Sequence, residues 1–427
     1  MTMKLPGVVM APLSAALVLT VLHGAAADDR VSAACRQSSS GQSAERRDAP
    51  AAPPALTPAV WSVVQGPIVP VLGSDGRHHL AYAIRFLNLA GSRVTIEAVT
   101  PVDPARENIP VGSDKVQDGG GRQVTGMIRP YPVEQEAGGQ RYSSQLEPGQ
   151  GGLVFLDVTF ERAEDIPTAI AHRVTQSQAG GTVVSAVAGR AEICRDDAVA
   201  LAPPLRGGGW MVALGCCEML SDHRTAVLPI NGALRPAQTF AIDFIRLDES
   251  TGRAWAGNPG DPRSWLGYGQ PVLAAAPGRV VSIRDGLPNQ PIGALPSDLP
   301  IADILGNHVI TDIGAGRYAF YAHMVPGSVR VQSGDVVEQG AELGLLGNSG
   351  NTSAPHLHFQ VMDGPSALDA NGLPFVFEQW DLSRRVAGTV NELERKVQAG
   401  EPVETSAAGT TERRRVLPLN LDIVAFP

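Results

Sequence analysis

Two histidines stand one residue apart in the segment SAPHLHFQV, which runs from Ser353 to Val361. Side chains at positions i and i+2 of a strand point to the same face of a sheet. His356 and His358 are therefore expected to share a face, while Leu357 and Phe359 point the other way into packing. A pair of hydrogen-bonded histidines on a solvated strand is the simpler interpretation. A metal ligand beside a catalytic imidazole is the alternative, and the rest of the chain has to decide between them.

Other residues of suitable chemistry favour a metal site. Four of the nine histidines fall between residues 308 and 358: His308, His323, His356 and His358. Histidine is the commonest protein ligand of zinc, and catalytic zinc typically has three protein ligands and one open position. Asp243 lies within the apolar run AIDFI. A buried carboxylate costs several kcal/mol unless a cation or hydrogen-bond donors compensate it. We therefore expect Asp243 to be a metal ligand.

Length and composition predict the class of fold. A chain of 427 residues exceeds one average domain, so two domains are expected. It has 47 glycines and 34 prolines, and turn residues separate short Val/Ile/Leu runs, which is typical of an all-β protein. The net charge of -9, with no basic stripe, argues against a nucleic-acid partner, because phosphate contacts need clustered lysine and arginine.

The N-terminus has the pattern of an exported protein. A basic start, MTMK, precedes a mostly apolar run at residues 5–22, and small residues follow at 25–27. This run is short for a membrane span, and no later segment is long and apolar enough to be one. We expect a signal peptide at residues 1–27 and a flexible leader at 28–56. The mature protein would then lie in the periplasm or outside the cell, with no integral membrane segment.

Strand patterns divide the rest of the chain into two β domains. Residues 57–205 contain runs that alternate apolar and polar residues, which predicts an immunoglobulin-like β-sandwich. The glycine-rich stretch Arg206–Gly209 is expected to be a hinge. Residues 207–427 are expected to form a second antiparallel β domain, with one short helix around Val390–Val397.

Four cysteines fit an oxidising compartment: Cys35, Cys194, Cys216 and Cys217. A bridge from Cys194 to one of the adjacent pair is plausible, while the full pairing stays open. A Cys/His zinc site is a weaker alternative, because the pair lacks the usual ligand spacing. His78 and His79 are expected at a surface turn.

Four segments, in order, resemble the lysostaphin/LytM-type zinc metallopeptidases. They are GNHVITDI from Gly306, YAH ending at His323, a glycine-bounded stretch over 327–350, and PHLHF from Pro355. The upstream run YGQPVLAAAPGRVV is also similar, and the resemblance covers about residues 225–380. It implies a compact antiparallel β domain with a narrow groove and bound zinc. It also implies cleavage of peptide bonds in bacterial peptidoglycan or another glycine-containing envelope peptide.

The resemblance also implies roles for individual residues. Asp243 and His358 resemble zinc ligands, and His323 and His356 resemble the catalytic histidines. Zinc would polarise the scissile carbonyl and lower the pKa of its water towards ~7. His356 would accept the proton of that water, and His323 would hydrogen-bond the oxyanion or the water. Three further residues are expected to line the substrate groove: Asn307, His308 and Tyr321.

One position departs from the family pattern. The family usually has H-x-G-x-D, in which the histidine is a zinc ligand, but this chain has TFAID, with Thr239 in place of the histidine. A threonine hydroxyl is a poor zinc ligand. His223, within SDHRTA, is the preferred replacement because it enters the domain near the Asp243 strand, and His308 is the other candidate.

Two functions stay open at this point. The first is an exported zinc metalloendopeptidase that acts on an envelope peptide. The second is a catalytically inactive peptide-binding, peptidoglycan-binding or regulatory module that has lost its metal through Thr239. The presence of both His323 and His356 favours the enzyme, because an inactive site has no chemical need for them. A third reading is a virulence-type or self-protective factor whose sandwich domain binds the target.

Overall fold

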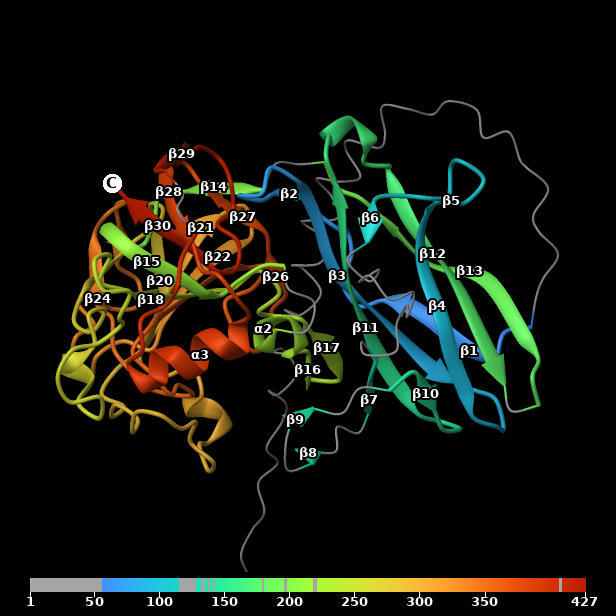
Figure 1. Cartoon of the computed structure of the whole chain (residues 1–427), viewed down its shortest axis with the longest axis horizontal. Helices are drawn as coiled ribbons and strands as arrows, with labels where there is room; N and C mark the ends of the chain where they lie inside the picture. The colour runs from blue at the N-terminus through green and yellow to red at the C-terminus, as the bar shows by residue number, and fades with distance from the viewer. Residues whose placement is uncertain are drawn as a thin grey trace, which may run out of the picture.

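The computed structural model describes residues 56–114, 128–131, 135–136, 139–140, 143–178, 180–195, 198–217, 221–406 and 409–427. The expected signal peptide at 1–27 and nearly all of the leader at 28–56 lie outside these residues. Two β units lie side by side, with the first on the right and the second on the left of Figure 1. Among the described residues, no helix has both the length and the apolar character needed to span a bilayer.

The first unit is a sandwich of two antiparallel sheets. One sheet contains β1 (Ala59–Val63), β2 (Val71–Leu72), β3 (His78–Asn88), β6 (Ser113–Asp114), β7 (Ile128–Tyr131) and β11 (Gly151–Phe160). The other contains β4 (Val94–Asp103), β5 (Ile109–Pro110), β10 (Gln145–Leu146), β12 (Ala169–Gln178) and β13 (Val183–Glu192). The elements beside them are the hairpin of β8 (Gln135–Glu136) with β9 (Gly139–Gln140), and the 3-10 turn η1 (Ala163–Asp165).

Alternating side chains of the two sheets form the core of the sandwich. Leu80 and Ile84 of β3 pack in one buried cluster with Ile96 of β4 and with Ile170 and Val174 of β12. Alternate residues of a strand point to the same face, so these side chains lie on the inner faces of the two sheets. The expected all-β class is confirmed, whereas the immunoglobulin-like character of the sandwich stays a prediction.

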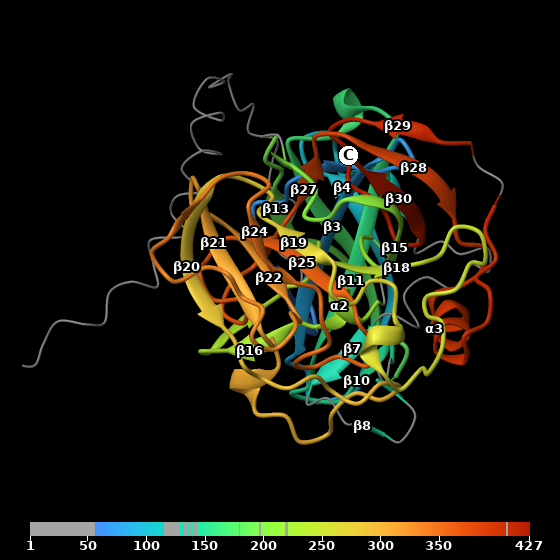
Figure 2. The same cartoon turned by 90° about the vertical axis from the view of Figure 1, so that its left-hand side faces the viewer.

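The second unit is built on an 11-stranded sheet. Its strands, in spatial order, are β23 (Val336–Val337), β20 (Gly278–Arg284), β21 (His308–Gly314), β22 (Arg317–Ala322), β25 (Leu357–Met362), β18 (Ile242–Arg246), β15 (Gly207–Leu214), β30 (Asp422–Phe426), β28 (Trp380–Arg385) and β29 (Thr411–Arg413), with β26 (Gly372–Leu373) beside β25. Smaller pairs are β14 (Val199–Leu201) with β27 (Phe375–Phe377), β16 (Leu228–Ile230) with β17 (Ala233–Arg235), and β19 (Pro271–Leu273) with β24 (Glu342–Leu345). Figure 2 shows this unit in front, with the sandwich behind it.

Short helical elements complete the second unit. They are α2 (Asp222–Thr225), α3 (Val390–Ala399), η2 (Pro262–Ser264) and η3 (Ile301–Asp303). The hydroxyl of Thr389 caps α3 by accepting a hydrogen bond from the Glu392 amide, and Gly400 ends the helix in a left-handed conformation. Leu393 and Val397 are the buried face of α3. The helix expected near residues 390–397 is therefore confirmed.

The glycine-rich stretch expected to be a hinge is instead part of a strand, so that prediction is wrong. Gly207–Gly209 begins β15, which lies between β18 and β30 in the large sheet. A Cβ atom at Gly209 would lie 2.3 Å from the carbonyl oxygen of Leu247. Close approach of two backbones, rather than flexibility, therefore explains the glycine.

The two units share a bonded contact surface. The Arg224 guanidinium on α2 donates hydrogen bonds to the carbonyl oxygens of Tyr82 (3.1 Å) and Leu156 (2.8 Å) in the sandwich. Gly73 of the sandwich also forms an isolated bridge with Leu417. The boundary expected between residues 205 and 207 stays a prediction.

The disulfide expectation is corrected. Cys216 and Cys217 are bonded to each other, so neither is available to Cys194. The bridge expected from Cys194 to this pair is therefore wrong.

Candidate metal and catalytic site

Strand register brings Asp243 and His358 together. Asp243 of β18 is directly opposite His358 of β25 in the antiparallel ladder. His358 Nδ1 lies 2.9 Å from Asp243 Oδ1, and His358 Nε2 lies 2.9 Å from Gln360 Oε1. An amide oxygen can only accept, so Nε2 carries a proton and donates it to Gln360. In the neutral imidazole, the lone pair of Nδ1 then faces the carboxylate, an arrangement that a bound cation stabilises.

A third candidate ligand atom comes from the short helix α2. His223 Nδ1 donates to the carbonyl oxygen of Ala241 at 3.2 Å. Its Nε2 lies 3.2 Å from Asp243 Oδ2. His223, Asp243 and His358 are all buried, and each offers one ligand atom within 4.8 Å of the others. Tetrahedral zinc with bonds of about 2.0–2.1 Å places its ligand atoms roughly 3.3 Å apart, so this donor set fits zinc.

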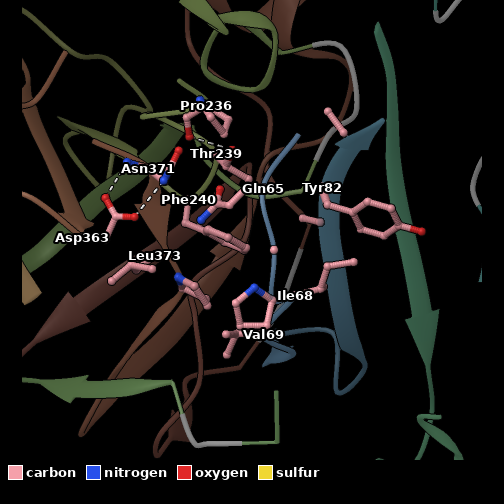
Figure 3. A pocket seen from close by; sticks show the side chains of 15 residues that line it. Gln65, Ile68, Val69, Tyr82, Pro236, Thr239, Phe240, Asp363, Asn371 and Leu373 are labelled. Atoms are coloured by element: carbon pink, nitrogen blue, oxygen red, sulfur yellow. Dashed lines mark hydrogen bonds between the residues drawn. The ribbon is translucent and has the colours of Figure 1, made fainter. Parts of the chain in front are cut away.

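Thr239 faces a different cavity. It lines a space of about 40 Å³ where the sandwich meets the second unit, together with Gln65, Phe240 and Asn371 (Figure 3). Its hydroxyl donates to the carbonyl oxygen of Pro236 at 3.0 Å. The position that carries the family histidine therefore contributes no atom to the metal group.

Two further imidazoles flank the metal group. His356 Nδ1 donates to the carbonyl oxygen of Ala354 at 2.8 Å, so its Nε2 is the free acceptor, 3.6 Å from Asp243 Oδ1. His323 follows the end of β22 with a left-handed φ of 65°, and its Nδ1 donates to the carbonyl oxygen of Ser349 at 2.7 Å. The His323 and His356 rings are 4.6 Å apart between centroids. Both rings thus have an unprotonated Nε2.

Burial and neighbouring charges set the protonation state of Asp243, His323 and His356. Burial alone would raise the pKa of Asp243, but the neighbouring imidazoles, chiefly His223 and then His356, hold it well below its usual value. Burial lowers the pKa of His356. The pKa of His323 is lowered well below its usual value by burial and, in addition, by the nearby imidazoles of His356 and His358. The site therefore combines an ionised carboxylate with two neutral imidazoles.

A cavity of about 690 Å³ opens at these residues. Its wall includes all five of them: His223, Asp243, His323, His356 and His358. The far wall is formed by α3, which the sequence analysis did not connect with the site. The period-two pattern of β25 did place Gln360 on the same face as His358, a signal that could have identified it as the partner of that imidazole.

The three residues expected to line the groove are not on the wall of this cavity. The Asn307 amide donates to the carbonyl oxygens of Leu287 (2.8 Å) and Met324 (3.1 Å). The Tyr321 hydroxyl accepts from the Ala275 amide at 2.8 Å, within the core. His308 is buried, and its Nδ1 donates to Gly306 at 2.8 Å. Their polar atoms bind neighbouring backbone groups instead.

A second group of ligand-type residues lies at the contact between the units. His79, Asp157 and Cys217 approach one another there, and all are buried. His79 contacts the carboxylates of Asp157 (3.0 Å) and Asp75 (3.1 Å), and the Cys217 sulfur is in a disulfide. This geometry suits a buried ion pair better than a metal site. It also corrects the expectation that His79 lies at the surface.

Two imidazoles and one carboxylate lie close enough to share a metal ion, and two further imidazoles lie on the wall of the same cavity. This donor set is of the kind that zinc hydrolases use. Residues 266–370 match the model of Peptidase family M23. This match confirms the resemblance of the second unit to the lysostaphin/LytM-type peptidases. Asp243 and His223 precede the matched residues.

Solved structures with similarity to the chain include several peptidases. The lysostaphin catalytic domain of Staphylococcus simulans is 25% identical, covering 34% of this chain and 80% of that one, with a TM-score of 0.20. A mutant catalytic domain of the prophage-encoded M23 protein EnpA from Enterococcus faecalis is 22% identical, covering 32% and 73%, with a TM-score of 0.21. A zinc-containing peptidase from Vibrio cholerae is 13% identical, covering 70% and 83%, with a TM-score of 0.21. The family assignment rests on the match at residues 266–370.

Proposed function

We propose that this protein is an exported zinc metalloendopeptidase that cleaves peptide bonds in peptidoglycan or another glycine-containing envelope peptide. The observation that carries the proposal is the position of His223. This residue supplies the third ligand atom beside Asp243 and His358, which removes the chemical reason for the inactive alternative. A periplasmic or extracellular location is part of the same proposal.

Each residue of the site has a separate role in the proposed reaction. His223, Asp243 and His358 would hold zinc, which, when bound, supplies a Lewis acid for a peptide carbonyl and for water. The free Nε2 of His356 would accept a proton from that water, as a general base. The imidazole of His323, whose centroid is 4.6 Å from that of His356 and 5.8 Å from that of His358, would position the water or the scissile group. Gln360 fixes the tautomer of His358 through its 2.9 Å contact.

Metal content tests the proposal. Mass spectrometry of protein purified without added zinc is expected to give about one zinc per chain. His358→Ala and His223→Ala should each lose most of it, since each removes one of three ligands. His356→Ala should keep the zinc and lower kcat by roughly 10²–10⁴ on a glycine-containing peptide, because it removes only the general base.

The control is His78→Ala, which changes a histidine in the sandwich and should affect neither readout. No zinc in the wild-type protein, even after micromolar zinc is supplied, would refute the proposal. Zinc that persists in His223→Ala would show instead that another residue is the third ligand.

A further inference from the structure

We propose that α3 forms a substrate-selecting wall and that Glu394 binds a terminal ammonium group carried by the substrate on a methylene stem. The inference rests on the proposed function, because it assigns a substrate class to the same cavity. α3 lies outside the residues that match the family, so the family match says nothing about this wall.

The helix presents one face to the cavity. The residues of α3 on the cavity wall are Val390, Asn391, Leu393, Glu394, Val397 and Gln398. Their spacing of three and four residues is that of one helical face. In the sheet, β18 separates β25 from β15, and α3 packs against β15. The wall therefore stands two strands away from the strand that carries His358.

The surface between the histidines and α3 is apolar. Met211, Ala213 and Ile245 line the cavity on β15 and β18, and Leu393 and Val397 line it on the helix. An alkyl chain gains free energy when it leaves water for such a surface. Side chains with a methylene stem and a charged end bury the stem and keep the end near water. This floor therefore fits the stem of a diamino-acid side chain.

Outside the candidate metal group, the charge on the cavity wall that has no ion-pair partner in the described part of the chain is negative, and on α3 it is that of Glu394. Besides Asp243 and the histidines, three charged residues line the cavity: Asp222, Glu394 and Arg235. Arg235 is neutralised by an ion pair with Asp369 at 2.8 Å. Among the described residues, neither Asp222 nor Glu394 is in an ion pair, and the Glu394 carboxylate accepts only from the Gln398 amide at 3.3 Å. A cation is the complementary group for this end of the cavity.

The basic side chains next to Glu394 on α3 form ion pairs away from the cavity wall. Arg395 forms an ion pair with Glu401, and Lys396 forms one with Glu404. Glu392 lies in the first turn and is not on the cavity wall. Glu392 is therefore a matched control for Glu394, because it is an exposed glutamate of the same helix that lies on a different face.

Equilibrium binding tests the proposal independently of cleavage. The probes are two fluorescein-labelled glycine-containing peptides, identical except that one carries a lysine and the other Nε-acetyl-lysine. They are titrated into the zinc-loaded His356→Ala protein, which should cleave them at least about a hundredfold more slowly than the parent. Fluorescence anisotropy is followed before cleavage becomes detectable. The free amine should bind about two- to fivefold more tightly, as expected for an exposed ion pair. Raising the salt concentration should reduce this preference.

Glu394→Gln should abolish the preference, and Glu392→Gln should preserve it. Equal binding of the two peptides, a preference that survives Glu394→Gln, or no binding of either peptide would each overturn the proposal. Peptide cleavage by the parent protein is measured separately. If the amine preference appears without any cleavage, the endopeptidase assignment fails and the Glu394 assignment stands.

Discussion

The residue that completes the candidate metal group is not the one that the family pattern names. Sequence spacing places a ligand four residues before Asp243, where this chain has Thr239. The structure instead brings His223 from a neighbouring helix, with Nε2 3.2 Å from the carboxylate. A metal requires donor atoms at defined positions in space and does not require a particular order along the chain. The site can therefore change the source of a ligand while its geometry is kept.

Placing histidine at position 239 should not improve zinc binding. The Thr239 side chain is buried at the small cavity between the units, away from the metal group. We expect Thr239→His to leave zinc affinity unchanged within about twofold and to cost about 1–3 kcal/mol of folding stability, because a larger side chain overfills that space. Zinc titration and chemical denaturation measure the two effects. The decisive variant is Thr239→His combined with His223→Ala: recovery of zinc binding there would contradict the assignment of His223.

At the scale of elements, the site depends on strand register and on one tight loop. The register of β18 with β25 aligns Asp243 with His358, and β22 beside β25 ends next to His323. A shift of one residue would turn every one of these side chains to the opposite face. The loop that ends at Gly350 supplies the carbonyl oxygen of Ser349 that orients His323.

Gly306 should be essential for the position of this loop. It has a φ of 65°, and a Cβ atom there would lie 2.2 Å from the Ser349 carbonyl oxygen. Gly306→Ala is therefore expected to cost about 2 kcal/mol or more in unfolding free energy and to lower peptidase activity through His323. Gly314→Ala is the control, because Gly314 has a φ of 87° but open space around it, so only the backbone term remains. Equal destabilisation in denaturant melts would exclude the steric explanation.

At the scale of the whole molecule, the sandwich supports the second unit through buried polar contacts. Arg224 follows His223 on α2 and is 2% exposed, and its guanidinium reaches two carbonyl oxygens of the sandwich. Burial lowers its pKa to about 10. The same short helix thus directs one side chain to the metal group and the next to the other unit. This contact anchors the four-residue helix that carries His223.

His79 should make the stability of this contact depend on pH. Burial opposes its charge, but hydrogen bonds to Asp157 and Asp75 and the charges of both carboxylates outweigh burial and raise its pKa to about 9. Because the pKa is raised on folding, the stabilisation is complete below about pH 6.5 and is lost as pH rises towards 9. At about 1.4 kcal/mol per pH unit, the loss is of order 3 kcal/mol.

Chemical denaturation at pH 6 and at pH 9.5 measures this loss. His79→Gln should be less stable than the parent at pH 6 and should lose the pH dependence. His78→Gln, at the adjacent half-buried position, should keep it. The same pH dependence in His79→Gln and in the parent would assign the effect to other groups.

Much of the fold was predictable because its signals are local. Apolar runs bounded by turn residues correspond to β3, β4, β11 and β25, and the short helix expected near residue 390 corresponds to α3. The glycines of β15 were misread, because glycine permits both a flexible turn and a close backbone approach. Only the neighbouring strand decides between these two uses.

The site was predictable where its residues lie on one strand, and less so where separate elements meet. The sequence by itself determined that His356 and His358 share a face, since a strand has a fixed period of two. It also placed Asp243 in an apolar strand where a carboxylate needs a partner. Only the tertiary structure decided that His223 reaches that carboxylate, that Thr239 turns away, and that α3 closes the cavity. These are contacts between segments far apart in the chain, and their distances depend on how whole elements pack.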